Sequence, residues 1–131
     1  FDTQKNLKVV KISAVKERML YDITRFEVVA GQPVRIDFTN PDATAHNIVI
    51  VMPGASEEVG LAANEMAKDP KEAQRGQFVP NSKKVLHATQ MVAPLSATAL
   101  RFTAPIEPGD YPYICTFPGH WIIMKGVMVV K

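Results

Sequence analysis

The segment from Cys115 to Met124 carries three side chains that can bind a transition metal. It reads Cys-Thr-Phe-Pro-Gly-His-Trp-Ile-Ile-Met, which places a thiol, an imidazole and a thioether within ten residues. Sulfur ligands select copper(I), and imidazole suits copper in either oxidation state. Two histidines and one cysteine in a trigonal plane, with a distant axial methionine, are the ligands of a blue-copper electron-transfer site. This segment supplies only one histidine, so the second must come from elsewhere in the chain.

His46 is the candidate for the second histidine. It precedes the strongly apolar run 47–51 and follows the turn-rich residues 40–44. In a β-sandwich, the beginning of such a run can lie beside the end of the run 111–115, where the thiol is placed. Without the Cys115 segment, His46 would be read as a core histidine. With it, we predict a metal ligand.

The residues between the cysteine and the methionine are suited to turn the chain back toward the same ion. Pro118 and Gly119 favour a turn that directs His120 toward Cys115. Met124 follows His120 by four residues and can lie on the same side of a helical turn. The other methionines lack this spacing, so we expect them to pack in the core or at its rim.

Alternating apolar and polar residues predict the strands that would hold these ligands. Between residues 33 and 39, Val34, Ile36 and Phe38 alternate with polar side chains, a period of two that is typical of a strand with one buried face. Similar runs indicate seven or eight short strands, at residues 7–12, 21–30, 33–39, 46–52, 85–91, 97–103, 111–115 and 126–130. We therefore predict an all-β fold, a Greek-key β-sandwich or barrel.

One short helix is expected as an insertion between the strands. Apolar residues at 59, 62, 63, 66 and 67 follow a helical period within residues 56–69. Ser56 can cap this helix, two glutamates suit the positive end of its dipole, and Pro70 ends it. Residues 68–84 are polar and contain prolines, so we expect a loop there with at most one further helical turn.

Length and composition limit the classes to which the chain can belong. With 131 residues, 47% of them apolar, it fits a single domain over residues 1–131 with a sizeable core. The net charge of +2 is too small to indicate nucleic-acid binding. No apolar stretch approaches the roughly 20 residues that span a bilayer. Cys115 is the only cysteine, which excludes an intrachain disulfide and a multi-cysteine metal cage.

The first residues, Phe1-Asp2, include neither an initiator methionine nor a signal segment. We therefore expect a processed protein or a piece of a longer one, whose parent could be anchored in a membrane.

The sequence resembles the azurins and auracyanins, which are members of the cupredoxin family. The likeness rests on Cys-Thr-Phe-Pro-Gly-His, three further residues, Met-Lys-Gly and a Val-rich end, together with His46-Asn47. It extends from about residue 7 to residue 131. It implies a cupredoxin fold, one type 1 copper ion and the transport of single electrons rather than enzymatic catalysis.

The resemblance also implies a ligand set. Cys115, His46 and His120 would be the strong trigonal ligands, and Met124 would be the weak axial ligand that helps set the reduction potential.

Around the ligands, the resemblance implies a shell of Ala45, Asn47, Thr116 and Phe117. Asn47 would join the two ligand-bearing loops through side-chain hydrogen bonds, and the Phe117 N–H would donate to the cysteine sulfur. Pro118 has no N–H, so it cannot add a second such bond. Ala45 stands where azurins usually have glycine, which leaves open whether its carbonyl contacts copper.

An apolar patch around the edge of the His120 ring is the expected docking surface for a redox partner. Its candidate residues are Trp121, Pro118, Gly119, Pro53 and Ala43. The partner would be a c-type cytochrome or another copper domain, and the location periplasmic or at the cell surface.

Other functions fit the residues less well. A catalytic multicopper centre needs further histidines, and only His87, expected at the surface, remains. The chain could be the electron-accepting module of a larger membrane-associated or multidomain redox enzyme. A copper chaperone or store would use the same donors but release the metal. A cysteine hydrolase would leave Met124 and the β pattern unexplained.

Overall fold

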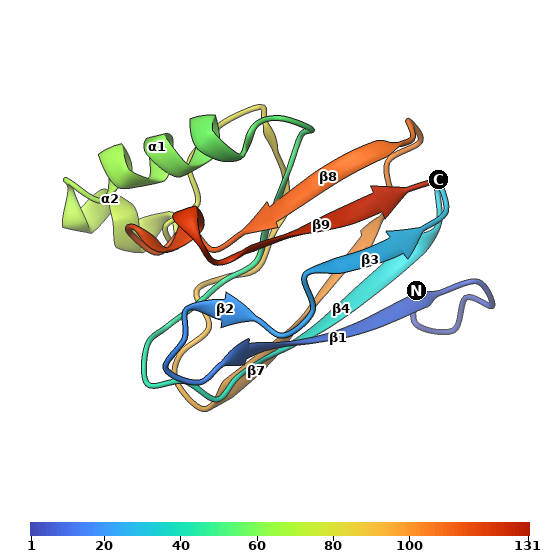
Figure 1. Ribbon diagram of the computed structural model, residues 1–131, viewed down its shortest axis with the longest axis horizontal. Helices are drawn as coiled ribbons and strands as arrows, with labels where there is room; N and C mark the ends of the chain where they lie inside the picture. The colour runs from blue at the N-terminus through green and yellow to red at the C-terminus, as the bar shows by residue number, and fades with distance from the viewer.

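The computed structural model describes residues 1–131 and arranges nine strands in two β-sheets that pack against each other (Figure 1). The four-stranded sheet has the order β2-β1-β4-β7 and consists of β1 (Lys8–Val15), β2 (Leu20–Tyr21), β4 (Pro33–Asn40) and β7 (Ser96–Thr103). The five-stranded sheet has the order β3-β9-β8-β5-β6 and consists of β3 (Arg25–Val28), β5 (Val49–Val51), β6 (Val85–Ala88), β8 (Gly109–Ile114) and β9 (Lys125–Val130). Only the pairs β1–β4 and β3–β9 are parallel. The predicted all-β sandwich is confirmed.

The core between the sheets follows the alternation predicted for residues 33–39. Val34, Ile36 and Phe38 of β4 are completely buried, and the polar residues between them are more exposed. Full burial of one such side chain contributes about 1.5–3 kcal/mol to folding. The main cluster contains 20 buried side chains, and Cys115 and Met124 are among them. The predicted site is therefore continuous with the hydrophobic core.

The predicted strand 21–30 is two strands in different sheets. Tyr21 in β2 pairs with Ala14 of the four-stranded sheet, whereas Phe26 in β3 pairs with Met128 of the five-stranded sheet. The chain changes sheet after Asp22, whose carboxylate accepts a hydrogen bond of 2.7 Å from the Ser13 N–H. That side-chain bond ends the β1–β2 ladder, and the chain crosses to the opposite sheet. This division raises the strand count to nine.

The insertion contains two α-helices where the sequence predicted one. α1 (Ser56–Met66) has Ala55 at its N-cap and no side-chain capping bond, so the prediction that Ser56 caps the helix is wrong. α2 (Pro70–Arg75) is longer than the single turn expected, because the Asp69 carboxylate caps it by accepting from two backbone N–H groups. Pro70 occupies the first turn of α2, where its missing N–H has no cost. It therefore begins a second helix after the first has ended.

The pairing of β5 with β8 determines where the predicted ligands meet. The two strands are antiparallel, with Val49 opposite Ile114. His46 lies three residues before Val49, and Cys115 directly follows Ile114. Both side chains therefore fall at the same end of the five-stranded sheet. A short 3-10 helix, η1 (His120–Ile122), continues the chain from there into β9.

His87 is not the free surface residue that the sequence suggested. It lies in β6, is half-buried, and stacks on Phe102 with ring centroids 4.8 Å apart. Its remaining neighbours on β6 are partly buried as well. No helix in the chain has both the length and the apolar character needed to cross a lipid bilayer.

Candidate metal centre

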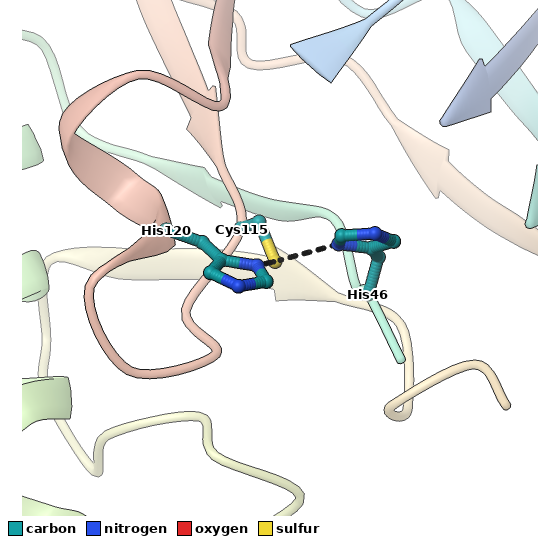
Figure 2. Close-up of side chains that lie close together, drawn as sticks. All are labelled: His46, Cys115 and His120. Carbon is teal, nitrogen blue, oxygen red and sulfur yellow. Dashed lines mark hydrogen bonds between the residues drawn. The ribbon is translucent and has the colours of Figure 1, made fainter. Parts of the chain in front are cut away.

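Three buried donor atoms converge at the end of the five-stranded sheet (Figure 2). The Cys115 Sγ lies 3.8 Å from the His46 Nδ1 and 3.6 Å from the His120 Nδ1. All three atoms lie within 4.8 Å of one another. His46 and Cys115 are completely buried, and His120 keeps 7% of its surface exposed. Two imidazole nitrogens and one sulfur at this spacing form a triangle that a single metal ion could occupy.

Backbone hydrogen bonds fix His46 in this triangle. Its N–H donates to the Val92 carbonyl at 3.2 Å, and the Val92 N–H donates to its carbonyl at 2.8 Å. This isolated β-bridge holds His46 just before β5 begins. The position of the imidazole is therefore set by the sheet rather than by a free loop.

The segment after β8 is closed by its own backbone bonds. The Cys115 N–H donates to the Met124 carbonyl at 3.1 Å, and the Met124 N–H donates to the His120 carbonyl at 2.8 Å. Gly119 adopts φ 82°, the left-handed conformation that glycine accepts without strain, and this turns the chain toward His120. Met124 is completely buried and belongs to the same side-chain cluster as Cys115. The thioether is thus enclosed with the other predicted ligands.

Asn47 joins the two ligand-bearing segments. Its Nδ2 donates to the Thr116 Oγ1 at 2.8 Å, and its Oδ1 accepts from the Thr116 N–H at 2.8 Å. Its carbonyl also accepts a hydrogen bond from the Tyr21 hydroxyl. Both Asn47 and Thr116 are completely buried, so each of these bonds is shielded from water.

Burial and hydrogen bonding act on the pKa of the cysteine thiol in opposite directions. Burial raises the pKa of the Cys115 thiol to about 11, while backbone hydrogen bonds from Asn47 and Phe117 act in the opposite direction. The sequence predicted the Phe117 donor and missed the Asn47 N–H, because that donor comes from a segment 68 residues earlier. A metal cation in the triangle would favour the thiolate, since a coordinating thiol is deprotonated.

The surroundings of the two histidines leave a lone pair on the nitrogen that faces the metal triangle. Burial, assisted by the nearby His46, lowers the pKa of His120 below its usual value, which favours the neutral imidazole. The His46 Nε2 lies 2.8 Å from the Oδ2 of Asp42, a residue that the sequence did not single out. The hydrogen bond with His46 lowers the pKa of the Asp42 carboxyl, so the carboxylate is the favoured form. With Nε2 donating to that carboxylate, Nδ1 is left as the lone-pair atom facing Cys115.

The predicted docking residues do not form one patch. Gly119 is exposed and Pro118 half-exposed beside His120. Trp121 turns inward, because its indole lies against Gly60 of α1, where an added Cβ would be 2.1 Å from the ring. Its Nε1 is buried without a hydrogen-bond partner. Two residues that the sequence did not select, Ile122 (57% exposed) and Ile123 (47% exposed), add exposed apolar side chains to the segment that carries His120.

The other two predicted docking residues lie outside the segment that carries His120. Ala43 is exposed on the loop before His46, beside a surface hollow of about 360 Å³. Pro53 follows β5 at the end of the sheet opposite the metal triangle, and a Cβ on Gly109, the first residue of β8, would lie 3.8 Å from its Cγ. Placing Pro53 at the His120 surface was wrong, because an antiparallel partner strand carries it in the opposite direction.

A two-sheet β-sandwich with a buried His-Cys-His triangle and an enclosed methionine defines the class of type 1 copper proteins. The family model described as copper binding proteins, plastocyanin/azurin family, matches residues 8–131, and the chain belongs to this family. One type 1 copper ion is its cofactor, and electron transfer is its function.

Two auracyanins of Chloroflexus aurantiacus are similar in sequence. Auracyanin-A is 34% identical over 124 residues, which cover 93% of this chain and 74% of the relative. Auracyanin-B is 33% identical over 128 residues, which cover 94% of this chain and about half (52%) of the relative.

Solved structures show the same fold. Dithionite-reduced auracyanin from Roseiflexus castenholzii has a TM-score of 0.82 and 34% identity, covering 95% of this chain and 97% of its own. Auracyanin A of Chloroflexus aurantiacus, described as a "blue" copper protein, has a TM-score of 0.83 and 29% identity. The match covers 95% of this chain and 99% of the auracyanin chain. An azurin from Methylomonas sp. strain J matches with a TM-score of 0.79 at 18% identity, a likeness of fold alone.

Proposed function

We propose that this chain relays single electrons between redox partners through one copper ion held by His46 Nδ1, Cys115 Sγ and His120 Nδ1, with Met124 as the weak axial ligand. The observation that carries this assignment is the convergence of three buried donor atoms within 4.8 Å. When bound, copper supplies the reversible change between its +1 and +2 oxidation states. The protein holds the ligands and excludes water from them.

The ligands are held in a way that resists rearrangement. His46 is fixed by its bridge to Val92, and Cys115 by its backbone bond to Met124. The bonds between Asn47 and Thr116 connect the two segments. A site whose geometry changes little between oxidation states imposes a small barrier to electron transfer. This rigidity supports a carrier rather than a protein that releases its metal.

The Ala45 carbonyl is available for a further weak axial contact. It accepts no hydrogen bond within the chain, whereas the carbonyl of the next residue, His46, is engaged by Val92. We therefore include it in the site as a weak fifth donor.

Electrons are proposed to enter and leave through His120. It is the one predicted trigonal ligand with an exposed edge, and Pro118, Gly119, Ile122 and Ile123 provide apolar surface around it. The net charge of +2 is too small to steer a partner over a long range, so contact through this apolar surface fits brief docking. A c-type cytochrome or another copper domain in the periplasm or at the cell surface is the proposed partner. The chain would serve as a single cupredoxin domain, alone or within a larger redox protein.

Reconstitution with copper(II) tests the proposal. We expect an intense blue colour from thiolate-to-copper charge transfer, which a reductant removes and an oxidant restores. Cys115→Ser should abolish the colour, and the control His87→Gln should retain it. A colourless wild-type protein, or one that binds only zinc, would contradict an electron carrier. Copper loss faster than reoxidation by a partner would instead favour a chaperone or store.

A further inference from the structure

Asp42 places a buried carboxylate directly behind the His46 ring. Its Oδ2 lies 2.8 Å from the His46 Nε2, and the residue is only 5% exposed. No lysine or arginine forms an ion pair with it, and its one ionisable partner is His46. A carboxylate is costly to bury unless its oxygens are hydrogen-bonded. The carboxylate is therefore committed to the histidine rather than to a surface ion pair.

Other bonds hold the second carboxylate oxygen. The Asp42 Oδ1 accepts from the Ala43 N–H at 2.8 Å and from the Glu17 N–H at 3.1 Å. Glu17 lies on the connection between β1 and β2, so two separate segments of the chain fix the carboxylate. The remaining oxygen points at the histidine ring. Asp42 thus has little freedom to turn away from His46.

The loop that carries Asp42 is itself fixed to the sheet. The Asp42 N–H donates to the Asn40 Oδ1 at 3.0 Å. The Asn40 Nδ2 donates to the carbonyls of Thr44 and Val92, at 2.9 and 3.0 Å. Val92 is also the backbone partner of His46. The aspartate and the histidine are therefore anchored to the same point.

The two histidines of the site differ in this respect. The His46 Nε2 is buried against a carboxylate, whereas the His120 Nε2 has no hydrogen-bond partner in the chain and faces solvent. A carboxylate that accepts from a ligating imidazole fixes its tautomer and ring orientation and makes the ligand more basic. A more basic ligand and a nearby negative charge both favour the more highly charged metal ion.

We propose that Asp42 is a positioning residue of the copper site, which fixes the His46 ring and lowers the reduction potential by stabilising copper(II) more than copper(I). This inference rests on the proposed copper ligation by His46 and adds to it a charged partner outside the ligand set.

The test compares Asp42→Asn with Asp110→Asn, each loaded with copper. Both substitutions remove one negative charge, but Asp110 is exposed at the start of β8, opposite the metal triangle. Asp42→Asn should weaken copper(II) binding roughly ten- to hundredfold and weaken copper(I) binding less. For each factor of ten by which the loss of copper(II) affinity exceeds the loss of copper(I) affinity, the reduction potential rises by about 59 mV. Asp110→Asn should retain the wild-type potential.

A measurement on the unmodified protein keeps the proposal testable if Asp42→Asn does not fold. In the copper(I)-loaded wild type, nitrogen-detected NMR should find the His46 proton on Nε2, exchanging slowly with water. A proton that exchanges as fast as that of His120 would overturn the proposal. Equal potentials for the two variants, both still blue, would overturn the role of Asp42 alone. A colourless wild type would overturn the copper ligation and this inference together.

Discussion

Asn47 and Thr116, which are 69 residues apart in the sequence, exchange two hydrogen bonds of 2.8 Å each. One segment carries His46 and the other carries Cys115, so this pair fixes the distance between two of the proposed ligands. The bond to the Thr116 backbone N–H is the more important of the two, because a backbone donor cannot turn toward another acceptor. The stability of the site should therefore depend on a residue that does not bind the metal.

Asn47→Leu should destabilise the metal-free protein. The substitution leaves the buried Thr116 N–H without an acceptor, which costs about 1–3 kcal/mol. Thr116→Val is the matched control, since it removes only the hydroxyl and keeps the backbone bond to Asn47. Urea unfolding of both variants provides the comparison, and a smaller loss for Asn47→Leu than for Thr116→Val would contradict the argument.

The effect of Gly60→Ala on the free energy of unfolding should depend on Trp121, and should be opposite in sign with and without the indole ring. In the wild type, the added Cβ would lie 2.1 Å from Trp121 Cδ2, so we expect a loss of about 1–3 kcal/mol from overpacking. In a Trp121→Ala background the ring is gone, and alanine should stabilise α1 by about 0.8–1.0 kcal/mol over glycine. Trp121 is the only tryptophan, so its fluorescence reports the displacement directly. The same sign in both backgrounds would show that the contact is unimportant.

Stability of the metal-free protein should fall in mild acid because of His87. Burial lowers the pKa of His87 in the folded state, so the unfolded chain binds its proton more readily. The neutral His87 ring makes its full contribution to stability above the unfolded pKa of about 6.5, and this contribution is lost as the pH falls toward the folded pKa. His87→Gln should show a smaller decrease between pH 7 and pH 5 in urea unfolding. If stability falls equally with pH in the wild type and in His87→Gln, protonation of His87 is not the cause.

Met124→Leu should leave the fold intact and raise the reduction potential. The side chain is completely buried, and a swap of similar volume costs less than about 1.5 kcal/mol. Although sulfur is a soft ligand, loss of the axial thioether removes electron donation to the metal and leaves an apolar side chain in its place, and both changes disfavour the more highly charged copper(II); the thiolate responsible for the colour remains. Spectroelectrochemical titration checks both effects, with the half-exposed Met91→Leu as the control. An unchanged potential would indicate that Met124 is only a core residue.

Ile122→Lys should slow electron exchange with a c-type cytochrome about tenfold, a loss of about 1.4 kcal/mol in docking. Ile122 is 57% exposed beside His120, so a lysine there disturbs the proposed contact surface without entering the core. Pro53→Lys adds the same charge at the opposite end of the sheet and should exchange electrons at the wild-type rate. Stopped-flow kinetics measures both variants. Equal slowing by both would point to an effect of net charge.

The proposed ligands could be selected from the sequence because donor chemistry and spacing are local properties. Cys115, His120 and Met124 lie on one short segment, and the apolar run after His46 marked the start of a strand. Asp42 was missed because a spacing of four residues predicts a contact on a helix but not in an irregular loop. Its contact with His46 depends on the turn that Asn40 stabilises.

Elements that depend on distant pairing were predicted less well. Residues 21–30 alternate between apolar and polar, but the alternation shifts phase between Ile23 and Phe26, and the change of sheet after Asp22 depends on a bond from Ser13. Pro53 was placed at the wrong end because an apolar run does not reveal which of its ends faces a given neighbour. The second helix depended on Asp69, whose role as a cap becomes visible only once α1 has ended at Met66.

The antiparallel pairing of β5 with β8 also has a consequence for the order of assembly. Residues up to the end of β7 contain one of the four proposed ligands, and the other three lie in the last 17 residues of the chain. During synthesis, a chain that has emerged only as far as β7 has no thiol and no axial sulfur to offer. Full coordination therefore begins only after the segment 115–124 has been made, and a metal-loaded site identifies a molecule in which β8 has already paired with β5.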